Sequence, residues 1–61
     1  MKEPVTTWIQ AEVARLDPPR DLKERNWVQL MLSMRVQEQF KKSIMEAVDL
    51  VAPLYADKFP H

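Results

Sequence analysis

One pair of carboxylates in this sequence has a spacing that could support acid–base chemistry. Glu46 and Asp49 lie three residues apart, so a helix would place both side chains on one face. Lys42 precedes them on the same stretch, and a solvated surface with both signs of charge accounts for all three residues. We therefore expect no catalytic site and no enzymatic activity.

Residue types that bind metals, phosphates or cofactors are scarce. The chain has no cysteine and no glycine, and its single histidine is His61, the last residue. Disulfides, Cys/His zinc sites and glycine-rich phosphate loops cannot be built from this composition. The Glu-x-x-His pairs of di-iron bundles are also missing. We expect neither a metal nor a cofactor.

Four basic residues around a proline pair could contact phosphate groups of DNA. Acidic residues alternate with them, and nine Lys and Arg balance nine Asp and Glu over the chain. This balance is not typical of a protein held mainly by phosphates. A solvated corner of mixed charge is the first interpretation, and a small dimeric DNA-binding transcriptional regulator is the alternative. The basic residues are Arg15, Arg20, Lys23 and Arg25.

The first element that positions these residues is an amphipathic helix, predicted over about residues 4–16. Apolar residues recur there with the spacing of a single helical stripe. Pro4 suits the first helical position, and Thr7 with Gln10 is an alternative capping box. The Pro18-Pro19 pair ends the helix. The stripe consists of Val5, Trp8, Ile9, Val13 and Leu16.

A second and much longer helix is predicted over about residues 21–52. Two caps are possible at its start: Asp17, before the prolines, and Asp21, which with Glu24 has the spacing of a capping box. Pro53 is expected to close the helix. The stretch between contains no proline or glycine and is rich in strong helix formers. An unbroken helix of this kind would be about 46 Å long, a length typical of coiled coils and bundles.

The middle of the long helix is polar, which leaves an alternative open. Gln37 and Lys41 interrupt the apolar seam, so the helix could break near Gln39 into two shorter helices. We favour continuity because no residue in the stretch terminates a helix. After Pro53, the apolar side chains of a short C-terminal tail are expected to fold back onto the bundle.

The apolar circumference of the long helix is greater than the short helix can cover. Leaving five or six large apolar side chains in water forfeits roughly 10 kcal/mol, which is comparable with the stability of a whole domain. We therefore predict an all-α two-helix hairpin that forms a four-helix bundle as a homodimer. The residues expected at the self-contact are Trp27, Leu30, Met31, Met34, Phe40, Ile44, Val48 and Val51.

These features indicate one small helical domain over residues 1–61 that works by binding proteins. We expect a self-associating interaction module that acts as a regulator or accessory subunit of a larger protein. The stretch "MKEPVTTW" lacks the apolar run of a signal peptide, and no segment approaches the roughly 18 apolar residues that span a bilayer. We therefore expect a soluble, cytoplasmic protein that has no membrane partner and whose main partner is not nucleic acid.

Overall fold

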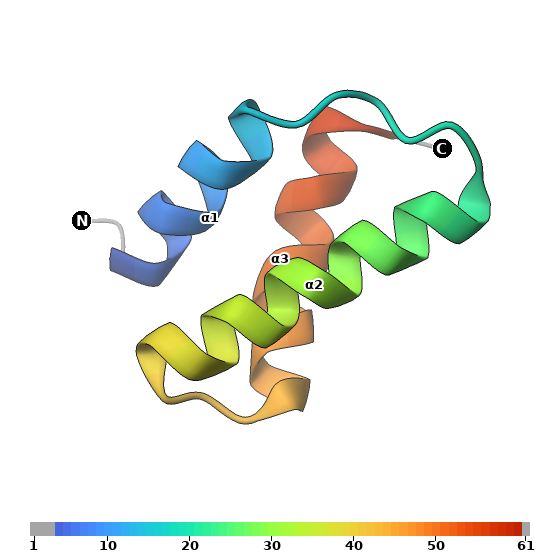
Figure 1. Cartoon of the computed structure of the whole chain (residues 1–61). Coiled ribbons are helices and arrows are strands. Elements are labelled where there is room, and N and C mark those ends of the chain that lie inside the picture. The colour runs from blue at the N-terminus through green and yellow to red at the C-terminus, as the bar shows by residue number, and fades with distance from the viewer. Residues whose placement is uncertain (1–3, 61) are drawn as a thin grey trace.

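Three helices make up the part of the chain that the structure describes, and that part contains no strand. The structure is a computed structural model that describes residues 4–60, with α1 (Pro4–Ala14), α2 (Leu22–Phe40) and α3 (Ile44–Lys58) (Figure 1). The all-α prediction is confirmed. The two-helix hairpin is corrected, because the helix predicted over residues 21–52 is divided into two. A four-helix bundle made from two such hairpins does not follow from a three-helix chain.

A tight turn after Phe40 divides the predicted long helix. Lys41 has φ 57° and ψ 42°, the left-handed conformation that most often ends a helix at glycine. The backbone N–H groups of Lys41 and Lys42 both donate to the carbonyl of Gln37, which completes the hydrogen bonding at the end of α2. The break lies close to the alternative position near Gln39. A lysine adopts this conformation in a chain that has no glycine.

Ser43 starts the next helix. Its hydroxyl accepts a hydrogen bond from the backbone N–H of Glu46 at 3.2 Å and donates to the Glu46 carboxylate at 3.3 Å. The run Ser-Ile-Met-Glu is therefore the Ser-x-x-Glu pattern of a helix start. This cap explains why a new helix begins within a stretch that neither proline nor glycine interrupts.

The start of α2 follows the sequence prediction. The Asp21 carboxylate accepts a hydrogen bond from the backbone N–H of Glu24 at 2.8 Å. Arg20 forms an ion pair with the Glu24 carboxylate, also at 2.8 Å, one turn along the chain. The predicted Asp21 cap is confirmed, and α2 begins at Leu22.

α3 continues past Pro53 instead of ending there. A proline inside a helix removes one backbone hydrogen bond and costs about 3 kcal/mol or more. The turns beyond it bury Tyr55 completely and leave Phe59 9% exposed. Burying side chains of this size gains about 1.5 to 3 kcal/mol each, which offsets the cost of the proline. The predicted helix end at Pro53 is wrong, and the expected tail is the last part of α3.

A side chain from α3 holds the end of α1. The helix stops at Ala14, before the predicted end near residue 16. The Lys58 ammonium group donates to the carbonyl oxygens of Val13 and Ala14, each at 2.8 Å, and to that of Leu16 at 3.0 Å. Carbonyls at a helix C-terminus lack partners within the helix, and a cation there also stabilises the negative end of the helix dipole. Lys58 therefore fixes α1 against α3.

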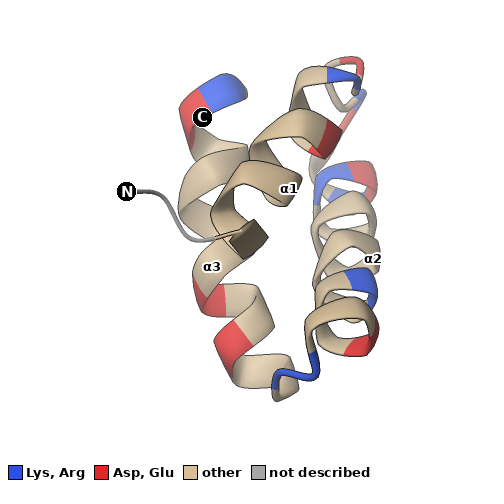
Figure 2. Ribbon diagram, turned by 90° about the vertical axis from the view of Figure 1, so that its left-hand side faces the viewer, with Lys and Arg blue, Asp and Glu red and all other residues tan. Residues whose placement is uncertain are grey.

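The core lies between α3 and the other two helices. α3 makes its most extensive contacts with α2 and also contacts α1, whereas α1 and α2 touch each other least. In Figure 1 α2 crosses in front of α3, and Figure 2 shows α1 lying over α3 on one side. The buried apolar side chains come from all three helices and from the residue after α3. They are Val5, Ile9, Val13, Leu32, Val36, Ala47, Val51, Tyr55 and Phe59.

A buried arginine joins α2 to the end of α3. Arg25 is 8% exposed, and its Nη1 atom donates to the backbone carbonyl of Phe59. Its Cζ atom lies 5.1 Å from the centroid of the Tyr55 ring, which is itself 5.2 Å from the Phe59 ring. The Tyr55 hydroxyl is buried without a hydrogen-bond partner among residues 4–60. Burial raises the pKa of Tyr55, although the positive charge of Arg25 acts to lower it.

Replacing Lys41 with glycine is expected to stabilise the fold. Lys41→Gly should raise the free energy of unfolding by about 0.5 to 1 kcal/mol, because glycine adopts the left-handed conformation without steric cost. Urea unfolding followed by far-UV circular dichroism measures the change. The matched control is Lys42→Gly, since Lys41 is the residue with a positive φ in the described chain. Equal losses in both variants would instead indicate a helix that continues through Lys41.

Removing the buried hydroxyl of Tyr55 is also expected to stabilise the protein. Tyr55→Phe should raise the free energy of unfolding by about 1 kcal/mol at neutral pH, because a buried polar group without a partner is costly. The parent chain should lose further stability relative to the variant above about pH 10, since its tyrosine ionises more readily when unfolded. Urea unfolding at neutral and alkaline pH measures both effects. A variant less stable than the parent at every pH would contradict them.

Candidate functional site

α2 carries apolar side chains on two opposite faces. Its inner face places Leu32 and Val36 in the core, 4% and 0% exposed. Its outer face carries four large apolar side chains with the i, i+3, i+4, i+7 spacing of one helical stripe. We call these residues the α2 stripe: Trp27 (60% exposed), Leu30 (44%), Met31 (43%) and Met34 (55%).

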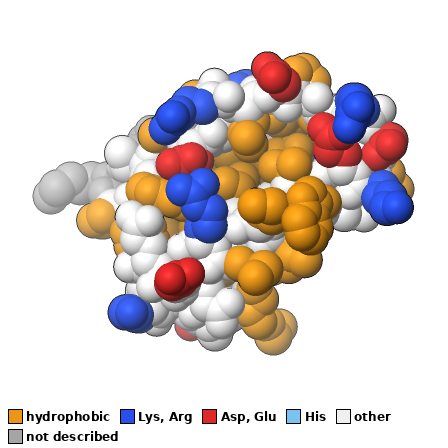
Figure 3. Space-filling view, viewed as in Figure 1, with side chains coloured by type: hydrophobic (Ala, Val, Ile, Leu, Met, Phe, Trp, Pro, Cys, Tyr) orange, Lys and Arg blue, Asp and Glu red, His pale blue; other side chains and the backbone are white. Residues whose placement is uncertain are grey.

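The apolar surface continues from α2 toward the start of α3. In Figure 3, which has the outer side of α2 toward the viewer, orange side chains gather over the middle of α2 and extend downward to the end where α3 begins. Ile44 and Met45 are exposed there. Together with Val48 and Asp49 they line a hollow of about 160 Å³.

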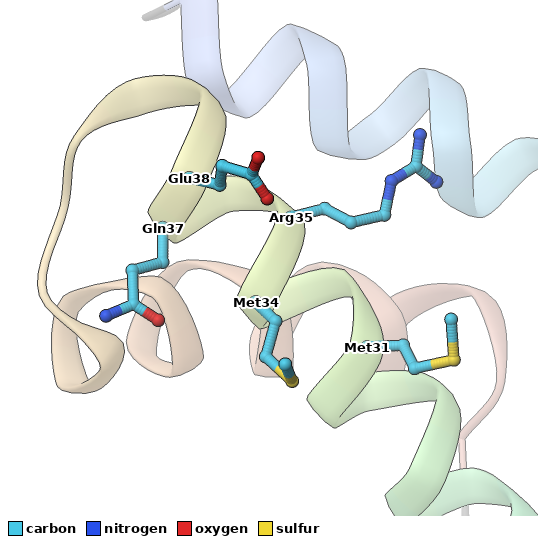
Figure 4. Close-up of a pocket in the computed structure, with 5 residues that line it drawn as sticks. All are labelled: Met31, Met34, Arg35, Gln37 and Glu38. Carbon is cyan, nitrogen blue, oxygen red and sulfur yellow. The ribbon is translucent and has the colours of Figure 1, made fainter.

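A larger hollow lies at the C-terminal end of the α2 stripe. It has a volume of about 390 Å³ and lies beside Met31, Met34 and three polar residues of α2. Figure 4 shows both methionine side chains projecting from one side of α2, while the Arg35 side chain reaches toward α1. The hollow therefore combines an apolar part with a polar edge. The polar lining residues are Arg35, Gln37 and Glu38.

Arg35 is held in place by contacts with α1. Its guanidinium lies 3.5 Å from the Glu12 carboxylate, and its Cζ atom lies 5.2 Å from the centroid of the Trp8 ring. The ion pair is partly exposed, so its contribution to stability is small. The contacts fix the direction of the Arg35 side chain toward α1 (Figure 4).

The structure brings most of the predicted contact residues to the surface, but it packs Phe40 against the core and buries Val51 in it. Trp27, Leu30, Met31, Met34 and Ile44 are exposed, and Val48 is partly exposed. Phe40 is partly buried, with its ring edge-on to Trp8 at 5.8 Å between centroids. Val51 is completely buried. We therefore leave Phe40 and Val51 out of the candidate surface.

Two large exposed apolar residues of the described chain were not among those expected at the self-contact. Met45 is 74% exposed and Leu22 is 64% exposed. Met45 lies two residues after the Ser43 cap, so recognising the Ser-x-x-Glu pattern would have placed it in the first turn of a helix. Leu22 is the first residue of α2, immediately after the Asp21 cap.

The residues considered for catalysis or for DNA binding are exposed at the surface or stabilise the fold. Glu46 belongs to the cap of α3, and Asp49 is exposed one turn further along. In the basic corner, Arg20 is paired with Glu24 and Arg25 is buried. Within residues 4–60, no cluster of three or more His, Cys, Asp or Glu is placed to hold a metal ion. None of the helices described there has the length and apolar character needed to cross a membrane.

The α2 stripe is thus the candidate functional site. It is a continuous apolar surface on a helix that already fills the core with its other face. No protein-family model, no curated protein and no solved structure matches this chain.

Proposed function

We propose that this protein is a small helical interaction module that binds a protein through the α2 stripe. It would self-associate and act as a regulator or accessory subunit of a larger protein. The observation that carries the proposal is that α2 is apolar on two opposite faces, and residues 4–60 cover only one of them. Large exposed apolar stripes on a small protein are typical of interaction sites.

The side chains of the α2 stripe suit a protein interface. Trp27 is 60% exposed, and tryptophan is enriched among the residues that contribute most to binding. Met31 and Met34 have flexible, polarizable side chains that adapt their shape to a partner surface. An apolar centre with a polar edge, as formed with Arg35 and Glu38, is the usual arrangement of protein interfaces.

The apolar area of the α2 stripe on one chain does not by itself supply enough free energy for binding. Covering the exposed parts of four such side chains gains on the order of 4 kcal/mol. Association loses translational and rotational freedom worth about 4 kcal/mol or more. A partner must therefore bury apolar side chains of its own, or add contacts at the edges of the stripe, where α2 carries charged residues.

We further propose that the module acts in the cytoplasm and has no catalytic role. A chain without cysteine gains nothing from an oxidising compartment, which fits a reducing one. The exposed Asp49 and the capping Glu46 support a structural and surface role for the carboxylate pair.

A charge within the α2 stripe is expected to abolish binding without unfolding the chain. Leu30→Glu changes an exposed helical position, so the free energy of unfolding of the monomer should change by no more than about 0.5 kcal/mol. Binding should be lost because a charge would be placed in a dry interface. Gln39→Glu is the matched control, since it adds the same charge at an exposed position off the stripe.

The test uses a photo-reactive residue at Met34 in the cell that makes the protein. Irradiation should give protein adducts, and these should disappear when Leu30→Glu is added but remain with Gln39→Glu. A photo-reactive residue at Ala11, exposed on α1, controls for chance encounters. Absence of adducts at Met34, or equal adducts at Met34 and Ala11, would contradict the proposal.

A further inference from the structure

We propose that the α2 stripe is covered by the α2 stripe of a second copy of this chain, with the two helices antiparallel. The two-fold axis would pass between the positions of Leu30 and Met31. This inference rests on the proposed function, because it names the partner of the same surface. The order of the side chains along α2 supports this antiparallel pairing.

The apolar side chains are symmetric about this midpoint. In an antiparallel pair, residues equally far from the axis on opposite sides lie across from each other. Leu30 would contact the partner's Met31, and Trp27 would contact the partner's Met34. The second contact sets a sulfur atom against an aromatic ring, which is a favourable combination. No position in the stripe would face a polar residue.

The charged residues that flank the stripe follow the same symmetry. Lys23 lies four residues before Trp27, and Glu38 lies four residues after Met34. Both are on the stripe side of α2 by helical periodicity and both are exposed. The antiparallel pair therefore brings each Lys23 to the partner's Glu38, twice per dimer. A parallel pair would instead oppose lysine to lysine and glutamate to glutamate.

The fold leaves room for this contact. α2 crosses in front of α3 with its outer side free of the other helices (Figure 1), and the space-filling view shows the apolar surface on that side (Figure 3). A standard interface buries about 800 Å² per partner, about a sixth of this chain's surface of 4567 Å². The stripe with its two charged flanks is smaller, so the dimer should be weak, with a dissociation constant on the order of 10 to 100 µM.

Sedimentation equilibrium of the purified full chain tests the proposal, at concentrations from about 10 µM to about 1 mM. The parent should dimerise. Lys23→Glu and Glu38→Lys should each raise the dissociation constant about tenfold, because each replaces two attractive pairs with two repulsive ones. Far-UV circular dichroism confirms that each variant folds. Arg15→Glu is the matched control, with the same change of charge at an exposed residue outside α2.

Restoration of dimers identifies the pairing. The double variant Lys23→Glu with Glu38→Lys should dimerise like the parent, and so should an equimolar mixture of the two single variants. Single variants that dimerise as strongly as the parent would overturn the antiparallel register. If the parent stays monomeric at the highest concentration, a second copy of the chain is not the partner of the α2 stripe. In that case self-association would be excluded, and adducts at Met34 with a different protein would still support the other part of the proposed function, the binding of a larger protein through the α2 stripe.

Discussion

The reversal of the chain between α2 and α3 is the constraint on which the other contacts depend. Lys41 takes a left-handed conformation, and Ser43 caps the helix that follows. These two features return α3 to the inner face of α2 within three residues. Without this reversal, the chain would continue as a rod and α3 would not lie against the inner face of α2.

The returning helix places its last turns where they can hold both other helices. Arg25 reaches the carbonyl of Phe59 and lies over the Tyr55 ring, so α2 is joined to the end of α3. Lys58 donates to three carbonyls at the end of α1. Leu32 and Val36 on the inner face of α2 pack in the core, and the described residues leave the α2 stripe on its outer face exposed.

Much of the fold could be predicted because local rules determine it. The apolar stripe of α1 and the Asp21 cap of α2 follow from residue spacing alone. The break could not be found by looking for proline or glycine, since a lysine occupies the left-handed position. The Ser-x-x-Glu pattern of Ser43 and Glu46 could have indicated that a new helix starts there. Pro53 predicted a helix end that does not occur. The burial of the aromatic residues beyond it outweighs the free-energy cost of a proline inside the helix.

The candidate surface was predictable on α2 and less so beyond it. The outer stripe follows from the width of the apolar arc, which exceeds the area one neighbouring helix covers. Val51 was assigned to the same surface on the assumption of one continuous helix. The turn after Phe40 changes the direction and the phase of the chain, so Val51 faces the core. The sequence alone does not reveal this change of helical phase, because an apolar residue such as valine suits the core and an interface equally well.

The three hydrogen bonds of Lys58 have a consequence for the order of folding. They join residues 42 to 45 positions apart in the sequence, whereas α2 and α3 are connected by a short turn. Closing a long loop costs more chain entropy than closing a short one, and contacts between distant residues form late. We therefore expect the α2–α3 pair to form first, and α1 to dock once the C-terminal turn of α3 has formed.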